Sequence, residues 1–359
     1  MKYHPSVVLC ACVLSWCLSA ACWTVVPARA ADAARPVVFR TQTMGTWASL
    51  TLVTADSAAV ADVALQSLLV FHHADSLMSN WSEESEVAHI NREAAEREIT
   101  VHPDVADVLG LALQVGRQSG GAFDITIEPL VRLWGFLGGT PHLPDQAEIT
   151  AALERVGQNN LRFNPDRGTI QFLRDDIKID LGGIAKGFGV DRVAELLRRG
   201  GVTDALIDLS GNMVALGNAA THNGWTVGIR DPSRAHPYLA RVHLYDEAVA
   251  TSGDYEQFVG AEGKRYGHIL DPRTGWSASG LSSATVVAER AMVADAWATA
   301  LFVLGPDEAR RVAGGRDDLT VVLIEPLDNG NVIVWVEEAL RPRFELLDEL
   351  IGTYTVRYF

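Results

Sequence analysis

Hydrophobic and polar residues alternate near the start of the chain and then recur with helical spacing. Residues 37–53 alternate on both sides of a turn at 44–46, which predicts two strands or a hairpin. Residues 58–78 carry an apolar stripe at spacings of three and four, which predicts a helix. A serine-rich polar stretch follows and runs into a short helix at Ser85. Another helix is expected over 103–118, because this segment begins at a proline and stops at a glycine pair.

The second half of the chain is rich in short segments typical of strands. These segments are residues 177–181, 204–209, 225–230, 238–245, 248–252, 319–324 and 331–337. Helical patterns cover residues 150–156, 189–199 and 292–304. No Pro-, Gly- or Ser-rich linker and no internal repeat divides the chain, so we expect residues 37–359 to form one compact α/β domain. Such a domain can have two lobes with a binding site between them.

The first thirty residues have a different character. Lys2 precedes an apolar stretch over 7–23, and Ala28 and Ala30 occupy the small-residue positions of a cleavage site, as in a secretory signal peptide. We therefore expect residues 1–30 to be removed, residues 31–36 to be a short flexible N-terminus, and the mature protein to be periplasmic. Lipoprotein processing at Cys22 is the open alternative, although the apolar residue before it sits one position too early.

Cysteine usage and charge narrow the chemistry. All the cysteines fall within the leader, at Cys10, Cys12, Cys17 and Cys22. The mature chain would then have no thiolate nucleophile, cysteine metal ligand or disulfide. Without Lys2 and Arg29 it has 28 basic and 45 acidic residues, a formal charge of −17, which argues against nucleic-acid binding. A polyanionic ligand would need local compensation from a metal ion or from backbone N–H groups.

The segment IKIDLGGIAKGFGVDRVAELL, residues 177–197, has the pattern of a strand, a glycine turn and an amphipathic helix. Gly182 and Gly183 permit close approach of the backbone to a ligand, and the helix N-terminus offers N–H groups to a phosphate. Phe188 stands where a Walker loop has its lysine, so the segment is not that motif. Taken alone, such a turn is more often structural than functional.

Asp295 and Thr299 lie four residues apart in MVADAWATALFVLG, so on a helix both side-chain oxygens share one face. Mg²⁺ prefers oxygen ligands and uses only one or two protein carboxylates when phosphates complete its shell. The pair is therefore a candidate magnesium site. The alternative is a charge at the start of a helix beside a packed threonine, which is more common for an isolated pair.

Three further residue groups are candidates. His268 lies in GHILDPRTG, where it could donate to a phosphate or move a proton, although a lone histidine is more often structural. Phe123 and Asp124 follow a glycine pair in GGAFDIT, where they could flank a flavin or pack in the core. Trp81, in a polar loop, is the exposed aromatic residue most suited to stacking.

Taken in order, these motifs resemble those of the ApbE family of FAD:protein FMN transferases. The likeness covers about residues 39–304: TMGT, LMSNW with SEESEVAHIN, GGAFDITIEPLVRLWGF, KIDLGGIAKGFGVDRVAELL with DLSGNMVALG, WTVGIRDP, VATSGDY, GHILDPRTG and ADAWATALFVLG. Agreement of several motifs in order is far more specific than any one of them. The resemblance implies an α/β fold with mixed sheets flanked by helices, and a flavin site in the cleft between two lobes.

The resemblance also implies which residues form the site. Those around FAD would be Met44, Trp81, Ala122, Phe123, Asp124, Asp180, Lys186 and Ile269 or Leu270. Magnesium would be held by Asp295, Thr299 and the backbone carbonyl of Gly183. Lys186 and the cation would offset the pyrophosphate charge in this acidic protein. Two positions depart from the family pattern: Trp81 replaces the tyrosine of many relatives, and Ala298 stands where some carry a further carboxylate.

The implied activity is Mg²⁺-dependent transfer of FMN from FAD to a Ser or Thr of an exported domain of a membrane redox protein, with release of AMP. The acceptor hydroxyl would attack the FMN-side phosphorus, and either His268 or Asp180 would take its proton. Two alternatives stay open: an FAD pyrophosphatase that makes FMN and AMP with water, and a periplasmic FAD-binding protein without turnover. The Asp295–Thr299 pair argues against the second, because a binding protein would not need it.

Overall fold

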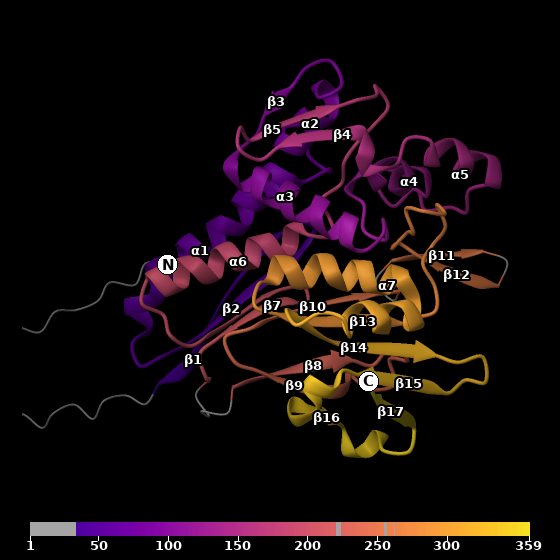
Figure 1. Cartoon of the computed structure of the whole chain (residues 1–359). Coiled ribbons are helices and arrows are strands. Elements are labelled where there is room, and N and C mark those ends of the chain that lie inside the picture. Colours follow the sequence, from indigo (N-terminus) through magenta and orange to yellow (C-terminus); the bar gives the residue numbers. More distant parts are fainter. Residues whose placement is uncertain (1–33, 220–223, 255–256, 262) are drawn as a thin grey trace, which may run out of the picture.

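The computed structural model describes residues 34–219, 224–254, 257–261 and 263–359. The expected leader, its cleavage point, Cys22 and residues 31–33 lie outside these ranges. Within the described residues, no helix combines the length and apolar character needed to cross a bilayer. The architecture is a large sheet with helices across one face and a small sheet against the other (Figure 1).

The main sheet is mixed, as the sequence predicts. Its strands are β1 Arg35–Thr43, β2 Thr46–Thr54, β6 Ala205–Leu209, β7 Asn212–Leu216, β10 Ala248–Gly253, β13 Ser283–Ala288, β14 Leu319–Pro326, β15 Val332–Val336 and β17 Tyr354–Tyr358. Among the described residues they follow one another in the order β1-β2-β6-β7-β10-β13-β14-β15-β17. Every neighbouring pair is antiparallel except β15 and β17, which are parallel.

Three helices lie across one face of this sheet: α1 Ser57–Met78, α6 Ala185–Arg199 and α7 Ala291–Ala313 (Figure 1). Helix α6 packs between the other two, and the aromatic rings of Phe71 in α1, Phe188 in α6 and Trp297 in α7 are fully buried. Burial of one such side chain stabilises the fold by about 1.5–3 kcal/mol. Gly305, at φ 76°, interrupts α7 just before Pro306, where the sequence predicts the helix to end.

A smaller antiparallel sheet covers the opposite face of the main sheet. Its strands are β8 Trp225–Arg230, β9 Tyr238–Leu244 and β16 Phe344–Leu346. Apolar residues from both sheets form one buried cluster, which includes Val242, Val322 and Val334. A separate hairpin, β11 Phe258–Ala261 with β12 Lys264–Gly267, leads to the segment that carries His268. The short 3₁₀ helices η3 Glu338–Arg343 and η4 Asp348–Leu350 flank β16.

The remaining elements form a second lobe on the outer side of the helices (Figure 1). They are α2 Glu86–Glu93, β3 Ile99–Thr100, α3 Pro103–Gln118, η1 Ile125–Ile127, α4 Glu128–Leu133, α5 Gln146–Leu153, η2 Gln158–Asn160, β4 Leu161–Asn164 and β5 Thr169–Phe172. Strands β3, β5 and β4 make a small antiparallel sheet. The fold is thus the two-lobed α/β architecture that the sequence predicts.

Segment 177–181 forms no strand and pairs with none among the described residues, so the strand predicted there is wrong. Side chains take the place of a neighbouring strand. Asn91 Oδ1 accepts from the Ile179 N–H at 2.7 Å, and the amides of Asn80 and Asn91 donate to the Ile179 carbonyl at 3.1 and 2.9 Å. The strand-like pattern comes from apolar residues that are fully buried at alternate positions: Ile177, Ile179 and Leu181.

Several element boundaries also differ from the predicted ones. Helix α6 begins at Ala185 rather than 189, directly after the glycine turn. Helix α5 begins at Gln146, four residues earlier than the predicted start at 150. Its N-terminus is fixed there by a capping box that Asp145 and Glu148 form. Strand β1 begins at Arg35, inside the segment expected to be flexible.

A candidate ligand site in the cleft

A cleft of about 470 Å³ collects the residues that the sequence singles out. Its lining includes every one of them: Met44, Trp81, Ala122, Phe123, Asp124, Asp180, Gly183, Lys186, His268, Ile269, Leu270, Asp295 and Thr299. Another hollow, of about 690 Å³, lies beside Val53 and Gly201. Among the described residues that line it, only Asp204 is ionisable. The smaller cleft is therefore the candidate site.

The glycine turn at one side of the cleft is shaped by its own side chains. Asp180 Oδ1 accepts from the Gly182 N–H at 2.6 Å, and the Asp180 N–H donates to the Ile125 carbonyl at 2.7 Å. Lys186 Nζ lies 3.3 Å from the Gly182 carbonyl, so its ammonium group sits over the turn. Helix α6 begins directly after the turn; its N-cap residue Ile184 makes no side-chain cap, and the Asp295 carboxylate accepts from the Gly187 N–H in its first turn. The turn therefore presents a cation and a helix N-terminus to the cleft, both of which favour phosphate.

Oxygen ligands gather beside this turn. The Asp295 carboxylate is 5% exposed, and its Oδ2 accepts from the Gly187 N–H at 2.9 Å, which ties α7 to the first turn of α6. Thr299 Oγ1 lies 3.2 Å from Ser252 Oγ. A methyl group on Gly183 would come within 3.4 Å of Thr299 Oγ1, so the glycine backbone is close to the threonine. The carboxylate and hydroxyl oxygens of Asp295, Thr299 and Ser252 are of the donor type that Mg²⁺ prefers. Ala298 is fully buried and does not line the cleft.

Met44 and Trp81 lie at the edge of the cleft. Met44 adopts φ 47°, a left-handed conformation that is uncommon for a residue with a side chain, and its N–H donates to Asp75 Oδ2 at 3.0 Å. Trp81 is 72% exposed in the loop between α1 and α2. Its ring is accessible for stacking against a planar ligand, as the sequence predicts for this residue.

Asp124 lines the cleft but uses both carboxylate oxygens within the protein. Its Oδ1 accepts from the Thr126 N–H at 2.8 Å and the Thr126 hydroxyl at 2.6 Å, while Oδ2 accepts from the Gln158 N–H at 2.9 Å. Asp124 therefore caps η1, and contact with a flavin stays a prediction. Its neighbour Phe123 is buried against Gly183, whose added methyl would lie 3.1 Å from the ring.

His268 lines the cleft and directly follows β12. Its backbone N–H donates to the Gln257 carbonyl at 3.0 Å, and its ring meets Phe136 edge to face at 6.3 Å between centroids. Ile269 is half-buried, whereas Leu270 is buried and pairs with Ser277 in an isolated bridge. The family pattern leaves open which of the two contacts FAD, and both line the cleft.

Some lining residues are not singled out by the sequence. Asn212 is 3% exposed, and no protein donor among the described residues reaches its Oδ1. Ser210, at φ 53°, and Ser252 also line the cleft. The motif DLSGNMVALG contains two of these residues, but its sequence alone does not say which side chains turn toward a ligand.

The fold and the cleft define a two-lobed α/β protein in which a glycine turn, a lysine and several side-chain oxygen atoms line one cleft. The sequence model of the ApbE family matches residues 44–323. The chain therefore belongs to the ApbE family, as its ordered motifs predict.

Individual relatives agree with this assignment. A Klebsiella pneumoniae protein named FAD:protein FMN transferase is 33% identical over 320 residues, which cover 87% of this chain and 89% of that protein. A Haemophilus influenzae protein of the same name is 34% identical over 263 residues, which cover 71% of this chain and 76% of that protein. The solved structure of the flavin transferase ApbE from Vibrio cholerae superposes with a TM-score of 0.78 at 27% identity, covering 86% of this chain and 99% of that one.

Proposed function

We propose that the protein is a Mg²⁺-dependent FAD:protein FMN transferase that attaches FMN through a phosphoester bond to a Ser or Thr of an exported protein and releases AMP. The names of its relatives support the reaction class. The observation that carries the proposal is that the glycine turn, Lys186 and the Asp295–Thr299 pair, which come from separate segments, line one cleft. These are the groups that a dinucleotide pyrophosphate and a divalent cation require.

Mg²⁺ fits the oxygen-only donor set beside the turn. Asp295, Thr299 and the Gly183 carbonyl would hold the cation, and the Ser252 hydroxyl lies next to them. When bound, Mg²⁺ neutralises charge on the pyrophosphate and on the departing AMP. This resolves the conflict between a phosphate ligand and a chain whose formal charge is −15.

The protein's own groups would bind and orient FAD and accept a proton. Lys186 and the N-terminus of α6 face the position where the pyrophosphate would lie. Asp180 holds the turn through Gly182, so we assign it a positioning role. We assign the general base to His268, because its imidazole lines the same cleft and an imidazole commonly takes protons near neutral pH. The proton of the acceptor hydroxyl would pass to the His268 imidazole as the hydroxyl oxygen forms its bond to the FMN-side phosphorus and AMP leaves.

A second candidate function is FAD pyrophosphatase activity at the same site. The observation in its favour is the exposure of Trp81, which leaves that edge of the cleft open to water. Water would then replace the acceptor hydroxyl, and free FMN and AMP would form.

We also propose that the protein acts in the periplasm on exported flavin-acceptor domains of membrane redox proteins. The support for this location is the leader-like pattern of the first thirty residues and the confinement of all cysteines to that segment.

The proposal is tested by incubating the protein with FAD, Mg²⁺ and an acceptor domain, then measuring AMP release and flavin fluorescence that stays with the acceptor in a denaturing gel. Transfer gives acceptor-linked fluorescence, hydrolysis gives AMP with free FMN, and a binding protein gives neither. Asp295→Ala should lower transfer by at least about 100-fold, because it removes the charged cation ligand. Asp307→Ala, at a 93% exposed side chain of the same helix, is the control. Unchanged transfer in Asp295→Ala would contradict the cation site.

A further inference from the structure

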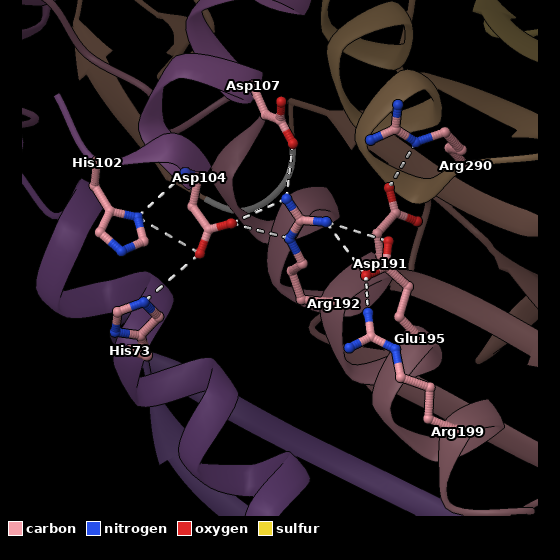
Figure 2. Close-up of polar contacts among 9 residues, drawn as sticks. All are labelled: His73, His102, Asp104, Asp107, Asp191, Arg192, Glu195, Arg199 and Arg290. Atoms are coloured by element: carbon pink, nitrogen blue, oxygen red, sulfur yellow. Dashed lines mark hydrogen bonds and ion pairs between the residues drawn. The ribbon is translucent and has the colours of Figure 1, made fainter. Parts of the chain in front are cut away.

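Two imidazoles and a carboxylate meet on the surface of the molecule, outside the residues that line the cleft. His73 comes from α1, His102 precedes α3, and Asp104 lies in the first turn of α3 (Figure 2). Asp104 Oδ2 is 3.6 Å from His73 Nε2 and 3.7 Å from His102 Nδ1. One ligand atom from each of the three residues lies within 4.8 Å of the other two. The cluster therefore joins two elements that are distant in the sequence.

We propose that His73, His102 and Asp104 form a second metal site that binds Zn²⁺. Tetrahedral zinc with ligands at about 2.0–2.1 Å separates neighbouring ligand atoms by about 3.3 Å. The two N···O separations exceed that value by only a few tenths of an ångström, which small side-chain rotations can close. Imidazole nitrogen suits Zn²⁺, whereas the oxygen-only set in the cleft suits Mg²⁺. The two sites thus select different ions.

The Asp104 carboxylate is held in the orientation that such a site needs. Its other oxygen, Oδ1, accepts from Arg192 Nη2 at 2.9 Å and Nε at 3.2 Å, so Oδ2 faces the imidazoles (Figure 2). Arg192 is itself held by Asp107 at 2.7 Å and by Glu195 at 3.2 Å. Partners of this kind fix the orientation of metal ligands. Arg199 also pairs with Glu195, so three carboxylates face two guanidinium groups and the local charge favours a cation.

The two histidines are ordered yet accessible. Their rings meet edge to face with centroids 5.4 Å apart, and their side chains are 50% and 41% exposed. Solvent can therefore supply the remaining ligand. His102 Nδ1 also accepts from the Asp104 N–H at 3.2 Å, as the cap of α3. Metal binding would replace this hydrogen bond, because both use the same lone pair.

A metal at this position would connect the elements that support two parts of the cleft. Two residues beyond His73, Asp75 accepts from the Met44 N–H at the cleft edge. Helix α3, which begins after His102, ends directly before the turn that leads to Phe123. Zn²⁺ would cross-link α1 to α3 and so stabilise the folded state, since the unfolded chain holds no such arrangement.

The test is calorimetric titration of Zn²⁺ into the chelator-treated, untagged protein, with Mg²⁺ in excess to occupy the cleft. We expect one equivalent to bind to the wild type, with Zn²⁺ raising its Tm. His73→Ala and His102→Asn should each bind at least about tenfold more weakly and show no Tm rise. Asparagine keeps a cap on α3, so the His102 variant should fold.

His142→Ala is the matched control, because the imidazole of this exposed histidine contacts only the Thr140 carbonyl among the side-chain hydrogen bonds of the described residues. Its Zn²⁺ affinity should equal that of the wild type. The visible absorption of bound Co²⁺ gives an independent readout of imidazole ligation. The proposal would be overturned if the wild type did not bind Zn²⁺, or if His73→Ala and His102→Asn both bound Zn²⁺ as tightly as the wild type does.

Discussion

At the residue scale, the cleft depends on side chains that do two tasks at once. The Asp295 carboxylate accepts a hydrogen bond from α6 and also faces the cleft. Asp180 shapes the glycine turn through a 2.6 Å bond to Gly182 while lining the same surface. Such residues are fixed before any ligand arrives, so the site needs little rearrangement on binding.

Gly183→Ala should impair the site while leaving the fold intact. The added methyl would lie 3.1 Å from Phe123 and 3.4 Å from Thr299 Oγ1, in the space beside the oxygen ligands. We expect a stability loss of about 1–3 kcal/mol, and a Kd for FAD with Mg²⁺ that rises about tenfold or more. Gly110→Ala, inside α3 and with the nearest atom 3.9 Å away, should leave the Kd unchanged and stabilise the protein by up to about 1 kcal/mol through helix propensity. Fluorescence titration measures the binding, and an unchanged Kd in Gly183→Ala would contradict the assignment.

Glu337 should make stability depend on pH. Burial raises the pKa of this carboxyl from 4.5 to about 7, partly offset by the Val321 N–H, which donates to it at 3.1 Å. Because the folded pKa is the higher one, protonated Glu337 favours the folded state. Its contribution is complete below about pH 4.5 and is lost as the pH rises through about 7.

Glu337→Gln cannot ionise, and its amide oxygen can still accept the Val321 N–H. After allowance for solvent screening, this variant should exceed the wild type by about 1–2 kcal/mol in free energy of unfolding at pH 8. The difference should shrink toward pH 4. Urea denaturation across this range measures it, and a constant difference would show that Glu337 does not titrate as described.

At the scale of elements, the existence of the long helices was predicted, whereas the starts of α5 and α6 and several buried or irregular segments were not. Helix α3 has the predicted bounds, because a proline and a glycine pair mark its ends in the sequence. Strand β13 was missed because all of its residues are buried, which removes the alternation that marks a strand. Segment 177–181 shows that alternation without being a strand, because Asn80 and Asn91 bond its backbone.

Asp191→Ala should destabilise the start of α7. From α6, Asp191 accepts from the N–H groups of Ala291 and Met292 at 2.7 and 3.0 Å, so one helix caps the next. Burial raises the pKa of this carboxyl despite the two bonds. Removing the cap should cost about 1–2 kcal/mol and lower transfer, since Asp295 lies one turn further along α7. Asp191→Asn should keep part of the cap, because its amide oxygen can still accept one N–H. Urea denaturation measures the free energy of unfolding, and equal values for the wild type, Asp191→Ala and Asp191→Asn would contradict this role.

At the scale of the whole molecule, the ordered motifs predicted more than any local pattern could. They predicted the family, the two lobes and a set of residues that all line one cleft. Ser252 and Asn212 were not singled out, because only the assembled fold brings Ser252 beside Thr299 and places Asn212, at the start of β7, in the lining of the same cleft. The site is therefore a property of the assembled sheet and helices, which no single segment encodes.

The central claim is that a divalent cation between Asp295 and Thr299 contacts the FAD pyrophosphate at the Gly182–Gly183 turn. The most direct test is a crystal structure with FAD and Mn²⁺, in which anomalous scattering locates the ion. We predict a peak within coordination distance of both side chains, the Gly183 carbonyl and phosphate oxygens of FAD. A peak elsewhere, or a pyrophosphate bound away from the turn, would contradict the account.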